Sequence, residues 1–96
     1  MLPKLDPLLH SELRLAVMSI LAGVEEADFT YLKTQTGATS GNLSVQIDKL
    51  TTAGFITVEN GFKGKMPRTT CRMTPAGQEA FNNYIKALQE YLSTGK

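Results

Sequence analysis

The sequence predicts a mainly α-helical domain with one small β-hairpin, an α+β fold in the order helix, helix, helix, strand, loop, strand, helix. Three observations predict it. Apolar residues recur at three- and four-residue spacing over the first half of the chain and again near its end. A short β-prone stretch and a glycine-containing basic loop separate these regions. With 96 residues there is room for one domain, which we expect to span residues 1–96.

The first helix has two candidate starts. Asp6 and Pro7 form a helix cap followed by proline at the first helical position. Ser11 and Glu12 offer a second start one turn later, which would leave a kink or a short separate turn before the helix. Gly23 is its expected end. One apolar stripe holds the helix together, made of Leu9, Leu13, Ala16, Val17, Ile20 and Leu21.

A short second helix is expected over residues 30–36. The connector before it, residues 25–28, leaves room for a very short strand. Phe29 and Leu32 are expected to point inward, and Gly37 supplies the positive φ of a tight turn at the end. Two short helices joined by such a turn form a helix-turn-helix.

The third helix is predicted over residues 39–53, capped by Thr39 or Ser40. Leu43, Ile47 and Leu50 fall at positions i, i+4 and i+7, so they form a narrow apolar stripe. The rest of this helix is rich in small polar residues. Its outward surface should therefore be small and polar.

A hairpin is predicted over residues 55–73. Residues 55–58 are β-prone, and residues 69–73 form the return strand. Asn60-Gly61 is a turn signal, and the residues up to Pro67 extend the expected loop to about eight residues. Between Asn60 and Thr74 the chain carries no acidic residue but four basic ones, Lys63, Lys65, Arg68 and Arg72. The hairpin should give the domain a positive side.

The last helix is predicted over residues 75–93, with Thr74 as its cap and Pro75 at its first position. Its broad apolar stripe consists of Phe81, Tyr84, Ile85, Leu88, Tyr91 and Leu92. This is more apolar surface than so short a chain needs for its own core, and Leu2, Leu5 and Leu8 before the first helix add to it. We predict that these nine residues form a dimer interface; the alternative is that both segments complete the core of a monomer.

In this order, the segments resemble the winged helix-turn-helix regulators of the MarR and ArsR type. Residues 14–21 are similar to the family's first core helix, residues 40–50 to its recognition helix, and residues 53–56 to the junction into the wing. Arg68 and the Met-Thr-Pro-Ala-Gly of residues 73–77 are similar to the wing arginine and the start of the final helix. The resemblance implies a homodimeric, sequence-specific DNA-binding transcriptional regulator whose first and last helices form a twofold interface.

Two departures from the family limit what the resemblance implies. MarR-type wings usually carry an acidic residue just before the arginine, whereas residues 65–68 are Lys-Met-Pro-Arg. Metal-sensing ArsR proteins carry paired cysteines, whereas Cys71 is the only cysteine here. Metal sensing is therefore not expected.

The third helix should lie in the major groove, which admits an α-helix. Asn42 and Gln46 can each pair with adenine through two hydrogen bonds, and Val45 can touch a thymine methyl group. The expected DNA contacts are Thr39, Ser40, Gly41, Asn42, Ser44, Val45, Gln46 and Lys49 from the helix, and Lys63, Lys65 and Arg68 from the wing. The alternatives are a plain solvated helix surface and a lysine-rich hairpin that only protects a sheet edge.

Other classes of function are weakly supported by the sequence. The pattern of a catalytic site is missing, since His10 is the single histidine and no phosphate-binding glycine loop occurs, so neither an enzyme nor a cofactor or metal site is expected. No apolar run is long enough for a membrane span, and residues 1–6 lack a signal-peptide layout, so we expect a cytoplasmic protein without membrane contact.

Three alternatives stay open at this point. A net charge of +1 and an acidic first third favour a protein-interaction module in a larger complex as the competing function. Cys71 is either a small strand hydrophobe or a redox-sensing thiol. A small-molecule effector of unknown identity is a further option, with a pocket near Tyr84, Leu88 and Tyr91 at the dimer interface.

Overall fold

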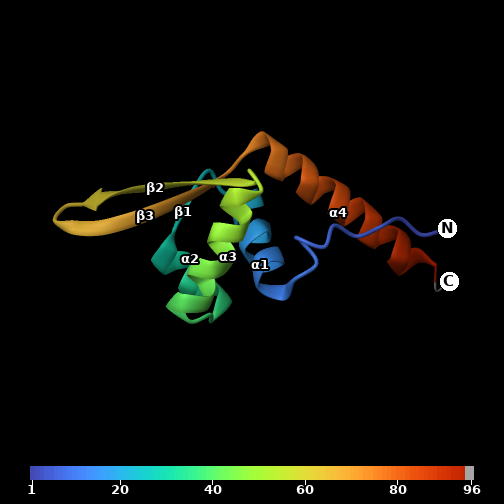
Figure 1. The fold of residues 1–96 in the computed structure, drawn as a ribbon, viewed down its shortest axis with the longest axis horizontal. Helices are drawn as coiled ribbons and strands as arrows, with labels where there is room; N and C mark the ends of the chain where they lie inside the picture. Colours follow the sequence, from blue (N-terminus) through green and yellow to red (C-terminus); the bar gives the residue numbers. More distant parts are fainter. Residues whose placement is uncertain (95–96) are drawn as a thin grey trace.

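The computed structural model describes residues 1–94 and has the predicted order of elements, with one short strand added. The elements are α1 (Glu12–Ala22), β1 (Ala27–Asp28), α2 (Phe29–Thr36), α3 (Ser40–Thr52), β2 (Ile56–Lys63), β3 (Met66–Met73) and α4 (Pro75–Ser93). The strands form one antiparallel sheet in the order β1-β3-β2. The winged helix fold predicted from the sequence is confirmed (Figure 1).

The chain takes the later of the two candidate starts for α1. Ser11 occupies the cap position with extended backbone, although its side chain makes no capping hydrogen bond. Asp6 instead organises a separate turn, in which its carbonyl accepts from the backbone N–H of His10 at 2.9 Å and its carboxylate from that of Leu8 at 2.9 Å. This turn places Leu9 in the core, where it is fully buried.

The helix-turn-helix is built by local hydrogen bonds. The Thr39 hydroxyl accepts from the backbone N–H of Asn42 at 3.2 Å and caps α3 as predicted. Gly37 ends α2 with a φ of 71°, also as predicted. The start of α2 differs from the prediction, because the carboxylate of Asp28 accepts from the Tyr31 N–H at 2.7 Å and the helix begins at Phe29 rather than Thr30.

The hairpin, which we call the wing, has longer strands and a tighter turn than predicted. Gly61 pairs with Arg68 inside the ladder, so the prediction of a turn at Asn60-Gly61 and of an eight-residue loop is wrong. The Asn60 side chain accepts a cross-strand hydrogen bond from the Thr69 hydroxyl at 2.9 Å, which fits it to a strand. Lys63 pairs with Met66, and Gly64, with a φ of 63°, provides the first residue of a two-residue turn.

The core lies between the three N-terminal helices and one face of the sheet. Its buried side chains are Leu9, Val17, Met18, Leu21, Ala27, Leu32, Leu43, Ile47, Leu50, Ile56, Cys71 and Tyr84. The narrow stripe of α3 is thus entirely in the core, as predicted. All other α3 residues, except the half-buried Gln46, remain exposed.

The molecule is elongated, with extents of 54 × 25 × 21 Å. The wing projects at one end, and the C-terminal part of α4 projects at the other beside the N-terminal segment (Figure 1). The Tyr91 hydroxyl, which donates to the Pro3 carbonyl at 2.6 Å, joins α4 to that segment. Within residues 1–94, no helix has the length and apolar character that crossing a membrane requires.

Candidate nucleic-acid interface

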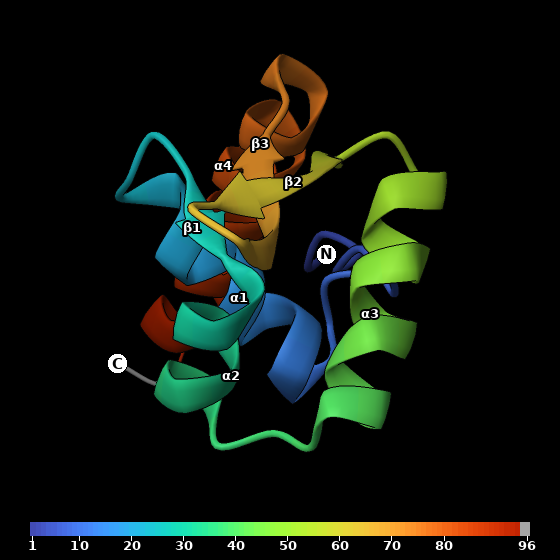
Figure 2. The same ribbon diagram turned by 90° about the vertical axis from the view of Figure 1, so that its left-hand side faces the viewer.

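Helix α3 lies along an edge of the molecule, with α1 and the sheet covering only its inner side (Figure 2). At 100° per residue, the positions opposite the buried stripe are exposed; they are Gly41, Asn42, Val45, Lys49 and Thr52. Val45 is the one large apolar side chain among them, and 49% of its surface is accessible. Apart from Lys49, this face carries short side chains, so another surface can approach the helix backbone closely.

The wing flanks one side of α3. Ser44, Ile47, Asp48 and Thr51 of the helix and Val58, Asn60 and Thr69 of the wing line a depression of about 370 Å³, to which Phe29 also contributes. Of the predicted site residues, Ser44 therefore borders the depression rather than the open face. Asp48 is exposed beside it and makes no ion pair within residues 1–94.

The tip of the wing is fully exposed and carries two lysines. Lys63 and Lys65 flank the turn glycine, and neither forms an ion pair within the described part of the chain. Two apolar side chains share this tip, Phe62 at 75% and Met66 at 70% exposure. The sequence analysis did not single out these two residues, although an aromatic residue beside a hairpin turn is a visible signal.

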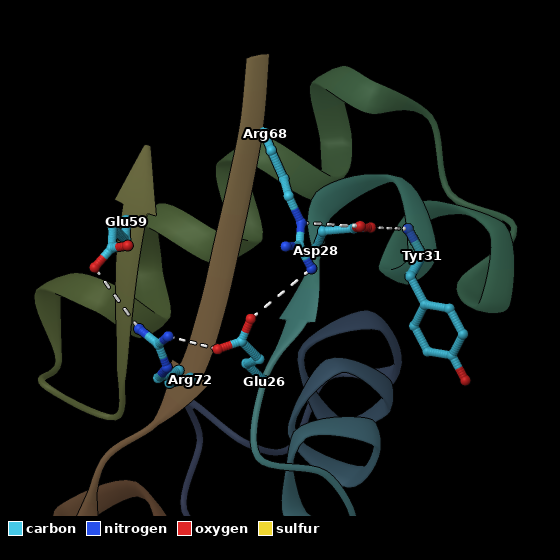
Figure 3. A network of polar contacts seen from close by, with 6 residues as sticks. All are labelled: Glu26, Asp28, Tyr31, Glu59, Arg68 and Arg72. Atoms are coloured by element: carbon cyan, nitrogen blue, oxygen red, sulfur yellow. Dashed lines mark hydrogen bonds and ion pairs between the residues drawn. The ribbon is translucent and has the colours of Figure 1, made fainter. Parts of the chain in front are cut away.

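Arg68, which was predicted to contact DNA, lies in an acidic cluster in this structure (Figure 3). Its Nε is 3.4 Å from Asp28 Oδ2, and its Nη2 is 3.8 Å from Glu26 Oε2. Arg72 joins the same cluster through Glu26 at 2.5 Å and Glu59 at 3.8 Å. The two arginines lie one and three residues from the buried Cys71, so both point to the outer face of the sheet.

This cluster changes the charge of the wing. Three carboxylates from β1, its preceding residue and β2 surround the two arginines, so their charges are balanced locally. Within residues 1–94, the wing cations that form no ion pair are Lys63 and Lys65 at the tip. The predicted basic side of the domain is consequently smaller than the sequence suggested.

Asn42 and Gln46 are brought together on α3 by a hydrogen bond of 3.0 Å from Gln46 Nε2 to Asn42 Oδ1. Gln46 in turn accepts from Arg14 of α1 at 2.5 Å. Arg14 was not among the site residues predicted from the sequence. The available signal was its isolation, since it is the only basic residue of α1.

The residues predicted for the dimer interface fall into two groups. Tyr84 is 4% exposed and bonds with His10 Nδ1 at 2.9 Å, and Leu5, Leu8, Phe81, Ile85 and Leu88 pack against the core. Leu2, Tyr91 and Leu92 lie at the projecting end and remain exposed, Leu92 at 73%. The first group therefore serves mainly the core of the single chain.

The environment of Cys71, the single cysteine, does not favour a reactive thiol. Cys71 is fully buried in β3, and burial, helped by the negative charge of Asp28, raises its pKa from 9.0 to about 11. A thiol is nucleophilic only when it is deprotonated, so this environment favours the inert, hydrophobic role. Residues 1–94 also contain no group of three or more His, Cys, Asp or Glu side chains placed to hold a metal ion.

Comparison with known proteins points to one family. Residues 13–92 match the model of the winged helix DNA-binding domain family. The chain is 36% identical over 77 residues to an uncharacterized protein of Methanocaldococcus jannaschii, an alignment that covers 79% of this chain and 83% of the relative.

Solved structures agree with this match at the level of the fold. A transcriptional regulator homologue from Pyrococcus horikoshii OT3 superposes with a TM-score of 0.85 at 24% identity, covering 91% of this chain and 86% of that one. A MarR-family regulator from Silicibacter pomeroyi gives a TM-score of 0.69 at 19% identity, covering 86% of this chain and 55% of the larger protein. The resemblance to MarR-type regulators is thereby confirmed for the fold.

Proposed function

Because the chain belongs to the winged helix DNA-binding domain family, we propose that it is a transcriptional regulator that binds double-stranded DNA as a homodimer. In this proposal α3 enters the major groove, and the wing lies on the backbone or in the minor groove. The observation that carries it is the exposed polar face of α3 next to a wing whose projecting tip carries two lysines.

The face of α3 fits the role of reading base edges. The major groove is about 12 Å wide and accepts a helix whose outer side chains are short. Asn42 and Val45 are the central exposed side chains, and Val45 has the apolar surface that a thymine methyl group can contact. Thr39 and Ser40 lie at the helix N-terminus, where partial positive charge favours a phosphate. Lys49 continues the row of Asn42 and Val45, Ser44 lies to one side of it, and both suit further phosphate contacts.

The wing supplies sequence-independent affinity. Each lysine that neutralises a phosphate releases a condensed counterion, so affinity falls as salt rises. Lys63 and Lys65 form no ion pair within residues 1–94 and can neutralise phosphates, whereas Arg68 is paired with Asp28 and Glu26. We therefore assign Arg68 to holding the wing against β1, and the two lysines to DNA.

The projecting end of the molecule supports the dimer. Leu2 of the N-terminal segment and Leu92 of α4 are exposed apolar side chains, and the Tyr91 hydroxyl joins the two segments at Pro3. A twofold interface there would present two copies of α3 to half-sites about one helical turn, ~34 Å, apart.

The test measures binding of the purified chain to labelled duplex DNA over a salt series. Wild-type affinity should fall linearly with log salt concentration. Lys63→Ala/Lys65→Ala should weaken binding to every duplex and reduce the salt slope by about 2, one for each phosphate contact. The matched control is Lys4→Ala/Lys86→Ala, which removes the same charge from exposed positions away from α3 and the wing and should leave the slope nearly unchanged.

Two results would contradict the proposal. Absence of binding at low salt would remove the DNA role and favour a protein-interaction module. Equal loss of slope in both double variants would show that net charge, and not the wing, governs the affinity.

A further inference from the structure

Three polar side chains form a continuous hydrogen-bonded relay from α1 to the exposed face of α3. Arg14 Nη1 donates to Gln46 Oε1 at 2.5 Å, and Gln46 Nε2 donates to Asn42 Oδ1 at 3.0 Å. The Nε of Arg14 donates a further hydrogen bond to the Leu8 carbonyl at 2.5 Å. The half-buried guanidinium is therefore held from two sides, by the N-terminal turn and by α3.

The direction of every bond in the relay follows from its first member. A guanidinium has five N–H donors and no acceptor, so Gln46 must turn its amide oxygen toward Arg14. The amide nitrogen of Gln46 then faces Asn42, and Asn42 must present its own oxygen to it. With its oxygen turned toward Gln46, Asn42 directs its NH₂ group to the solvent side.

We propose that Arg14 is a positioning residue that sets which base Asn42 reads, an inference that rests on the DNA-binding function proposed above. With both amide oxygens of the relay engaged, Asn42 offers N–H donors. Guanine presents two adjacent acceptors in the major groove, N7 and O6, and matches them. Adenine presents one acceptor and one donor, so its bidentate recognition also needs the Asn42 oxygen, which the hydrogen bond from Gln46 turns toward Gln46 and away from the groove. This reverses the adenine preference expected from the sequence.

The test selects bound sequences of the full chain from a random duplex library. The position read by Asn42 is the one whose base preference disappears in Asn42→Ala. Wild type should prefer guanine over adenine there by about tenfold, within the usual range for one bidentate contact. A second measurement keeps the wild-type protein and replaces that guanine by 7-deazaguanine, which lacks the N7 acceptor. The affinity of the protein for this duplex should be lower.

Two variants separate positioning from folding. Arg14→Lys keeps a donor-only cation at the head of the relay, so it should retain the guanine preference. Arg14→Met keeps an unbranched side chain but frees the Gln46 amide to turn, so it should bring guanine and adenine to within about threefold of each other. Both variants should keep the salt slope of the wild type.

Several results would overturn the inference. They are an adenine preference in the wild type, an unchanged guanine preference in Arg14→Met, no effect of 7-deazaguanine, and salt-dependent binding without any base preference. In each of these cases the proposed DNA-binding function would stand. Absence of binding at all salt concentrations would instead refute the proposed function, and the inference with it.

Discussion

Individual residues determine where the helices begin and end. Thr39, Thr74 and Gly37 act within one or two turns of their own positions. Asp28 and Arg14 act over longer distances. Asp28 serves both a helix start and a cross-strand ion pair, and Arg14 bonds to a residue 32 positions away.

Gly77 is the residue where α4 comes closest to the base of the wing. A Cβ atom there would lie 2.0 Å from the Phe55 carbonyl oxygen and 2.8 Å from its carbon, and backbone atoms cannot move aside as a flexible side chain can. Gly77→Ala should lower the free energy of unfolding by about 2–4 kcal/mol, measured by urea denaturation. Gly41→Ala, whose Cβ would meet nothing within 4 Å, is the control and should be neutral or stabilising. Equal effects of the two substitutions would refute this packing.

Cys71 gives the domain a pH dependence on the alkaline side. Its pKa is about 11 when folded, raised from 9.0 by burial and by Asp28. Between these values the unfolded chain has lost the thiol proton and the folded chain still holds it. The unfolded state then binds fewer protons, so the free energy of unfolding should fall as the pH rises from 9 to 11. In Cys71→Ala, the decrease in the free energy of unfolding that is due to the thiol should be absent. If the free energy of unfolding depends on pH in the same way in both proteins, the raised pKa of Cys71 is contradicted.

At the scale of the elements, the wing is where sequence and structure differ most. Asn-Gly is a strong hairpin signal, but register is set by the whole ladder. Pairing from Ile56–Met73 out to Lys63–Met66 places the turn at Gly64-Lys65, four positions beyond Asn60-Gly61. The acidic cluster around Arg68 was unpredictable for a related reason, because it depends on β1 pairing with β3.

The turn position can be tested with two glycines of the same hairpin. Gly64 has a φ of 63°, whereas Gly61 lies in the ladder without a positive φ, and a Cβ at either position would meet nothing within 4 Å. Gly64→Ala should destabilise the domain by about 1–2 kcal/mol through backbone strain, and Gly61→Ala should cost nothing, as measured by thermal unfolding. The reverse order would place the turn at Asn60-Gly61.

On the scale of the whole molecule, the elongated shape separates two surfaces. The wing and α3 lie away from the end where α4 and the N-terminal segment project (Figure 1). The excess apolar surface of α4 was visible in the sequence. The division of this surface into a core part around Tyr84 and an exposed part around Leu92 was not visible in the sequence. It depends on the point at which α4 extends beyond the rest of the domain.

The dimer predicts a molecular mass of about 21 kDa in solution, twice the 10.5 kDa of one chain. Light scattering coupled to size exclusion measures it. Leu92→Glu should shift the protein toward monomer, because it places a charge in the proposed apolar interface. Phe62→Glu makes the same kind of change at the wing tip, outside that interface, and should leave the mass unchanged. A wild type that stays monomeric at about 100 µM would exclude a stable dimer.

The most direct test of the central claim is to map the DNA-binding surface by NMR, titrating duplex DNA into the labelled protein at low salt. The account predicts amide shift changes concentrated in residues 39–49 and 61–67, with residues 78–92 of α4 little affected. Changes confined to α4, or none in α3 and the wing, would contradict it.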